Sequence, residues 1–186
     1  MSYKADGKAS KNMGEASEAT TDFCVSGAML MAYVKNVETL LKPLTTENPE
    51  KAPPPFDLGP KIVPNMERAL GLSFLPKKDE HGNVCMANNP EVRNEYKDTF
   101  DHKDLMGYIY AIWYSPTYQK AHNTALKNDS FRIPYPKDPN FFWQLAGLGL
   151  ALRAYHKLQA PLIEKHKEDI AHILKQIALA TTKASP

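Results

Sequence analysis

The sequence predicts a mainly α-helical protein, a compact helical domain with short extended segments and a flexible N-terminal arm. In most of the chain, apolar residues recur every three or four positions, which places them on one face of a helix. The chain also lacks an internal repeat and the alternation of strands and helices that would indicate a nucleotide-binding sheet. A length of 186 residues suits one domain with its own core, and we expect that domain over residues 22–186.

The N-terminal third is predicted to contain one helix between two irregular segments. Residues 1–21 are nearly free of large apolar side chains, so burial cannot offset the entropy of ordering them, and we expect a flexible arm. Helical spacing of apolar residues predicts a helix over Ser26–Leu41, which Pro43 stops. Thr45–Pro60 contains three consecutive prolines and is predicted to be an extended connector.

The middle of the chain combines short elements with a polar loop. A proline at position 64 suits the first turn of a helix that Gly71 ends, and Leu72–Leu75 is predicted to be a short strand. Residues 77–99 are polar and contain a turn signal, so a loop is expected there.

Capping residues mark the next two predicted helices. Asp101 is suited to cap a helix over Lys103–Tyr114, whose wide apolar surface indicates burial. Ser115 is suited to cap a second helix that runs from Pro116 to about Lys127. Phe131–Pro136 is predicted to be extended, because each proline disfavours the helical conformation in the residue before it.

Two helices are predicted to complete the fold. One runs from Asn140 to about Leu158, and the other from Pro161 to about Thr181. The first contains Gly147-Leu148-Gly149, which superficially suggests a nucleotide-binding loop. No strand precedes it, so close packing of two helices is the favoured interpretation.

Charge is distributed unevenly along the chain, although the net charge is only +2. Up to Pro116 there are 13 basic and 16 acidic residues, which gives −3; after it there are 10 and 5, which gives +5. A polyanion is therefore expected to bind the C-terminal part, although a solvated lysine face explains the asymmetry about as well.

The cysteines and the hydropathy pattern indicate a cytoplasmic protein. Cys24 and Cys85 are far apart and form neither a disulfide framework nor a zinc motif. No secretion signal and no apolar window of membrane-spanning length is present, so no membrane association is expected.

Three motifs between residues 103 and 158 carry a family resemblance. They are Tyr108–Lys120 (YIYAIWYSPTYQK), Phe131–Asp138 (FRIPYPKD), and the apolar spacing of Phe142, Leu145, Gly149, Leu152 and His156. This segment resembles the C-terminal target-recognition region of Type ISP restriction-modification enzymes and related adenine-specific DNA methyltransferases. Gln119 stands where an arginine is common in that family.

The resemblance implies a DNA target-recognition module of a restriction-modification or phage-defence system. Its expected partners are double-stranded DNA and an adenine methyltransferase or motor subunit. The chain contains neither a glycine-rich cofactor loop nor the Asn/Asp-Pro-Pro-aromatic element of adenine methylation, and it has no P-loop. We therefore expect no catalytic activity and no cofactor. Two alternatives stay open, namely a helical interaction subunit that never touches DNA and a truncated relic.

The expected DNA-binding residues bracket the Arg-Ile-Pro segment. Lys120, Lys127, Arg132 and Lys137 are expected to line one rim that contacts phosphates, with Arg132 able to contact either guanine or phosphate. The ordinary alternative for Arg132 is a salt bridge to Asp129 or Asp138.

Aromatic and histidine side chains provide few further candidates. Tyr118 is expected to join the DNA contacts, although helical spacing places most members of its aromatic group in the core: Tyr108, Tyr110, Trp113, Tyr114 and Tyr118. The spacing of His156, His166 and His172 does not fit a helix-borne zinc site, so no metal is predicted.

Overall fold

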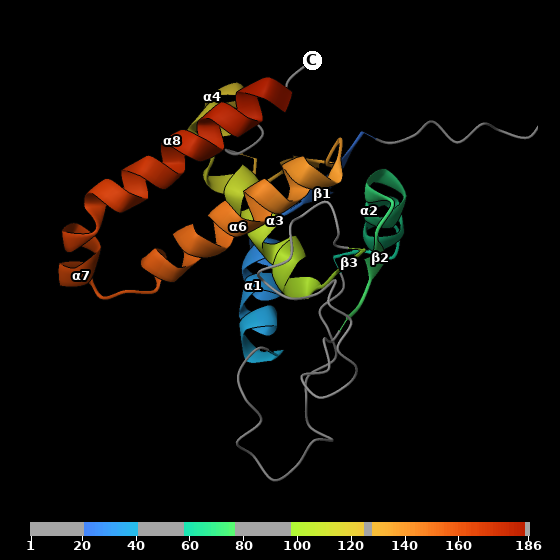
Figure 1. The fold of residues 1–186 in the computed structure, drawn as a ribbon, viewed down its shortest axis with the longest axis horizontal. Helices are drawn as coiled ribbons and strands as arrows, with labels where there is room; N and C mark the ends of the chain where they lie inside the picture. Colours follow the sequence, from blue (N-terminus) through green and yellow to red (C-terminus); the bar gives the residue numbers. More distant parts are fainter. Residues whose placement is uncertain (1–20, 41–57, 77–97, 125–127, 185–186) are drawn as a thin grey trace, which may run out of the picture.

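The computed structural model describes residues 21–40, 58–76, 98–124 and 128–184, and these residues form a predominantly helical fold (Figure 1). This confirms the predicted fold class. The elements in chain order are β1 (Asp22–Val25), α1 (Gly27–Leu40), α2 (Ile62–Leu70), β2 (Ser73–Phe74), β3 (Thr99–Phe100), α3 (His102–Tyr114), α4 (Pro116–Ala121), β4 (Phe131–Pro134), α6 (Pro139–His156), α7 (Ala160–Lys165) and α8 (Lys167–Ala184). In the described part of the chain, no helix has the length and apolarity needed to cross a membrane.

Helices α3 and α6 cross at the centre of the molecule (Figure 1), and glycines allow their backbones to approach closely. Every residue of α3 from Leu105 to Ile112 is buried. A Cβ atom on Gly149 would overlap the Gly107 carbonyl and lie 2.9 Å from the Ala111 nitrogen, whereas one on Gly147 would meet nothing within 4 Å. The interpretation of this Gly-Leu-Gly sequence as a helix-packing site is therefore confirmed, with Gly149 in contact.

A two-stranded antiparallel ribbon, β1 paired with β4, lies beside this helix pair. Its inner face buries Phe23 and Val25 from β1 and Phe131 and Ile133 from β4. The extended conformation predicted for the Phe131 segment is confirmed. Strand β1 was not predicted, because its pairing partner lies more than a hundred residues away in the sequence.

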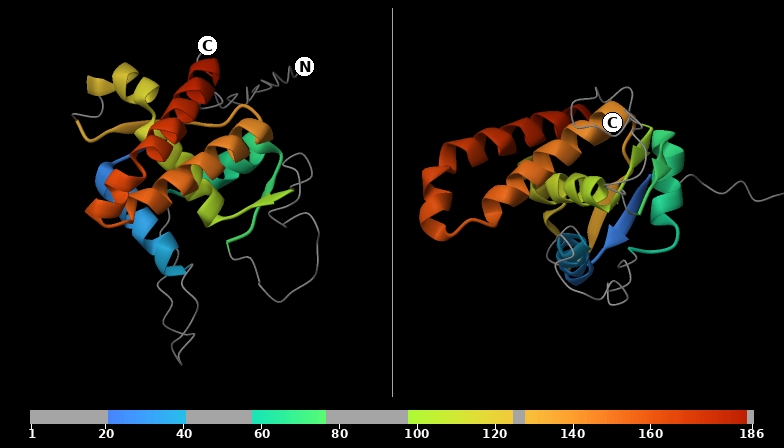
Figure 2. Two further views of the ribbon diagram at one scale, coloured as in Figure 1. Left: turned by 60° about the vertical axis from the view of Figure 1, so that its left-hand side comes forward. Right: turned by 60° about the horizontal axis from the view of Figure 1, so that its bottom comes forward.

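Helix α2 and the parallel pair β2–β3 form a smaller unit on the side of the molecule where β1 lies (Figure 2). Gly71 ends α2 in a left-handed conformation, with φ of 66°, as its position predicted. The Glu67 carboxylate accepts a hydrogen bond from the Phe74 amide, which ties the helix to the following strand. Strand β3 corrects the expected loop at Thr99; most of that loop, together with the connector and the arm, lies outside the described residues.

Capping explains where α3 and α4 begin. The Asp101 carboxylate accepts from the Asp104 amide, and the Asp104 carboxylate accepts from the Asp101 amide, which forms a capping box. The Ser115 hydroxyl accepts from the Tyr118 amide at 3.3 Å and lies 2.9 Å from the Thr181 hydroxyl of α8. Ser115 therefore begins α4 and also connects the α3–α4 junction to the last helix.

Two predicted helices differ from the observed ones. Helix α4 ends at Ala121, where His122 has a non-helical φ of −113°, and Asn123 and Thr124 are helical again, so the helix predicted from Pro116 is interrupted within its length. The predicted helix from Pro161 is divided into α7 and α8, because His166 leaves the helical conformation at φ −103° and ψ 19°. The break lets the chain reverse direction, so that α8 runs back beside α6 and buries Ile177 (Figure 2).

Candidate nucleic-acid interface

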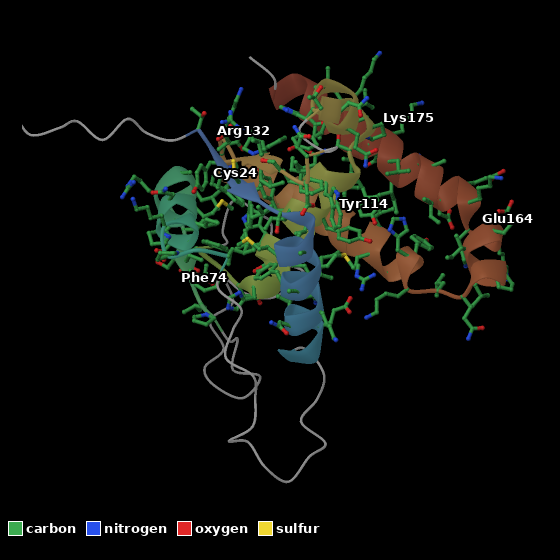
Figure 3. All side chains as sticks on the ribbon, turned by 180° about the vertical axis from the view of Figure 1, so that it is seen from behind. Cys24, Phe74, Tyr114, Arg132, Glu164 and Lys175 are labelled. Atoms are coloured by element: carbon green, nitrogen blue, oxygen red, sulfur yellow. The ribbon has the colours of Figure 1, made fainter. Side chains whose placement is uncertain are left out.

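The outer face of the β1–β4 ribbon carries Arg132, one of the exposed residues of the predicted site. Because side chains alternate along a strand, Asp22 and Cys24 of β1 and Arg132 of β4 point away from the core. Arg132 lies directly opposite Cys24 in the pairing register, and Figure 3 shows the two close together. The Arg132 side chain is 60% exposed.

Arg132 has an acidic neighbour on the adjacent strand. Its Nη1 atom lies 3.6 Å from Oδ2 of Asp22, a long contact in which both side chains are accessible to water. The sequence had suggested Asp129 or Asp138 as the salt-bridge partner, and this was wrong. Asp129 accepts from the Gly27 amide, and Asp138 caps α6 by accepting from the Phe141 amide.

Two buried tyrosines hold strand β4 in place. The Tyr118 hydroxyl donates to the Arg132 carbonyl, and the Tyr108 hydroxyl donates to the Pro134 carbonyl at 2.7 Å. Burial raises the pKa of both phenols, so both remain protonated donors at neutral pH. Hydrogen bonds from α3 and α4 therefore fix the backbone of β4 at Arg132.

This arrangement revises the expectation that Tyr118 touches DNA directly. Tyr118 is only 7% exposed, and its hydroxyl is already hydrogen-bonded to strand β4. It has little surface for stacking on a base. Its place is beneath Arg132, as a residue that positions the strand.

The other predicted basic residues lie on segments adjoining this ribbon. Lys120 is exposed on α4, the helix that Tyr118 connects to β4, and Lys137 is exposed in the turn between β4 and α6. We call Lys120, Arg132 and Lys137 the basic edge. Lys127 lies outside the described residues. Asp22 lies beside Arg132 of the basic edge. This proximity could not be identified from sequence because strand β1 was not predicted.

The aromatic group is mainly structural, as its spacing predicted. Tyr108, Tyr110 and Tyr118 are buried, and Trp113 and Tyr114 are partly buried against the core. The side chain of Gln119, at the position where an arginine is common in the resembling family, donates to the Trp113 carbonyl at 2.9 Å.

A second polar cluster connects α1 to the end of α6. Arg153 Nη2 lies 2.7 Å from Glu38 Oε1, and the guanidinium carbon lies 5.7 Å from the centre of the Tyr110 ring. The Tyr110 hydroxyl is 2.8 Å from Nδ1 of His156. Burial, and then the charge of Arg153, lowers the pKa of this histidine. Because the charges of Glu38 and Arg153 are paired across the contact between α1 and α6, the cluster fastens these two helices together.

No group of three or more His, Cys, Asp or Glu side chains among the residues that the structure describes is arranged to hold a metal ion. His166 instead lies 3.0 Å from the Asp169 carboxylate, at the junction of α7 and α8.

Comparison with known proteins identifies a family match over most of the chain. The model of the Type ISP C-terminal specificity domain matches residues 28–183. No curated protein and no solved structure matches. The match includes the segment around residues 103–158 that carried the resemblance, and it extends over α1, α2, α7 and α8 as well.

Proposed function

Because the chain belongs to the Type ISP C-terminal specificity domain family, we propose that it recognises a site on double-stranded DNA for a restriction-modification methyltransferase. Catalysis is left to the methyltransferase and motor partner in this proposal. The observation that carries it is an exposed arginine on a rigidly supported ribbon, with lysines on the adjoining segments.

The basic edge is suited to contact a phosphate backbone. A cationic side chain that neutralises a phosphate releases a condensed counterion, so binding weakens as salt concentration rises. Lys120 and Lys137 are exposed and Arg132 is only loosely paired, so their charges remain available to a polyanion. This supports DNA contact despite the small net charge of the whole molecule.

The test is a fluorescence-anisotropy titration of duplex DNA at ~50 and ~200 mM salt, with each phosphate contact contributing about −0.9 to the log–log slope. Glutamate at Lys120, Arg132 and Lys137 together should remove most of the affinity and make the slope less steep. The fold, followed by circular dichroism, should be unchanged because all three side chains are exposed.

A matched control separates a local site from overall charge. Glutamate at Lys61, Lys103 and Lys165 makes the same change in net charge at exposed positions on other elements. It should weaken binding far less than the first triple variant does. Equal weakening by both would refute the basic edge, and no salt-sensitive binding at tens of micromolar, with or without the partner, would reject the proposed function.

A further inference from the structure

The outer face of the β1–β4 ribbon presents few side chains around Arg132. Asp22 lies opposite Pro134 and Cys24 lies opposite Arg132 in the register, so the neighbours of the arginine are all short. A two-stranded antiparallel ribbon is narrow enough to enter the major groove of B-DNA. Short neighbours leave the guanidinium as the part of this face that extends furthest.

The backbone of Arg132 is held more firmly than a phosphate contact requires. Phe131 and Ile133 on either side are buried, and the carbonyls of Arg132 and Pro134 accept from buried tyrosines. The Tyr135 amide donates to the Thr21 carbonyl at 3.0 Å, which extends the pairing of the two strands. Reading a base requires placement within about half an ångström, whereas phosphates tolerate looser contacts.

Asp22 is an unexpected residue for a surface that meets DNA. A carboxylate there repels phosphates, so on a merely electrostatic surface it would lower affinity. At 3.6 Å from Arg132 Nη1, it instead attracts the guanidinium towards the β1 side of the ribbon without a direct hydrogen bond. A guanidinium has enough N–H donors to bind a carboxylate on one edge and an acceptor pair on another.

We propose that Arg132 reads a guanine in the major groove, donating to its N7 and O6 atoms, and that Asp22 is a positioning residue for the guanidinium. The target site would then contain a G·C pair that the ribbon selects. This inference rests on the proposed function and adds to it the element that enters the groove, the base that is read and the role of an acidic residue.

The first experiment uses the full chain and a random duplex library to define the preferred sequence, followed by titrations of variants. Arg132→Lys keeps the positive charge but loses the two-pronged geometry. It should retain salt-sensitive binding while the preference for guanine at one position falls by about 5- to 150-fold. Lys120→Ala is the contrasting variant, expected to weaken binding to all sequences alike.

Asp22→Asn has two expected effects of opposite sign. Removing a negative charge from the surface should increase affinity for non-specific duplex, while the preference for guanine should fall because the guanidinium is less well oriented. If Asp22 had a purely structural role, non-specific affinity and the preference for guanine would not change in opposite directions. Cys24→Ser, a nearly isosteric change on the same face, should leave both unchanged.

Replacing the selected guanine by 7-deazaguanine, which lacks the N7 acceptor, should weaken wild-type binding and leave the Arg132→Lys variant nearly unaffected. Full preference for guanine in Arg132→Lys would overturn the inference and assign Arg132 to a phosphate. Salt-sensitive binding by the wild type without any base preference would overturn the base-reading ribbon while DNA binding stands. Absence of salt-sensitive binding would instead refute the proposed function.

Discussion

The crossing of α3 and α6 yields a pair of substitutions with opposite expected effects. Gly147 and Gly149 lie in the same helix two residues apart, and only Gly149 faces the backbone of α3. Replacing glycine by alanine within a helix normally increases stability by up to about 1 kcal/mol. At Gly147, where a Cβ atom meets nothing within 4 Å, this gain should appear in full.

At Gly149 the steric cost should exceed the gain in helix propensity. The added methyl would overlap the Gly107 carbonyl and approach the Ala111 nitrogen to 2.9 Å, and both are backbone atoms that no rotamer change can move. The two helices would have to separate, and overpacking of this kind typically costs about 1–3 kcal/mol or more. Because the gain in helix propensity is common to both variants, they should differ by the steric cost alone, about 1–3 kcal/mol or more.

Urea unfolding followed by circular dichroism measures this difference through the midpoint, provided that the slope m is unchanged. For a chain of this size each kcal/mol corresponds to about 2–4 °C in Tm, so thermal unfolding should show the same order. Gly107→Ala, which would overlap the Ala146 carbonyl, should behave like Gly149→Ala. If Gly149→Ala were as stable as Gly147→Ala, the close backbone contact between α3 and α6 would be refuted.

Three further predictions test the caps, the support of the ribbon and a half-buried histidine. Asp101→Ala removes one half of the capping box of α3 and should lower the free energy of unfolding by about 0.5–2 kcal/mol in urea titrations; an unchanged midpoint would contradict its capping role. Tyr118→Phe removes the hydroxyl that donates to the Arg132 carbonyl and should cost about 0.5–1.5 kcal/mol, with a loss of guanine preference larger than the loss of non-specific affinity; equal losses would argue against positioning. The pKa of His156 is lowered from 6.5, so its contribution to stability is complete above pH 6.5 and is lost as the pH falls through 6.5 towards the folded-state value. In urea titrations across this range, the free energy of unfolding of His156→Gln should depend less on pH than that of the wild type. Identical pH profiles would exclude His156 as the cause of the pH-dependent stability.

Local signals predicted the helices and their ends well. The Asp101 cap, the Ser115-Pro116 start of α4 and the left-handed Gly71 all act within a few residues of the element they define. The break at His166 was missed because no glycine or proline marks it, and a polar run such as residues 164–169 is also compatible with the solvated face of a continuous helix.

The candidate site was only partly accessible from sequence. The proline-flanked segment around Arg132 could be recognised as extended and cationic, since proline restricts its own backbone and that of its neighbour. The partner of Arg132 could not be recognised. That contact depends on a strand pairing between segments more than a hundred residues apart, and the local pattern in β1 is too short to predict it.

The amino-acid order alone determined the helical class, most helix boundaries and the cationic character of the C-terminal part, because these follow from periodicity, caps and composition. Only the tertiary structure decided that Asp22 lies beside Arg132, that Tyr118 supports the strand from below, and that Gly149 rather than Gly147 contacts α3. The physical reason is the separation in sequence over which each kind of interaction acts. Backbone preferences and capping act over a few residues, whereas a salt bridge between strands or a helix crossing exists only after distant segments have packed.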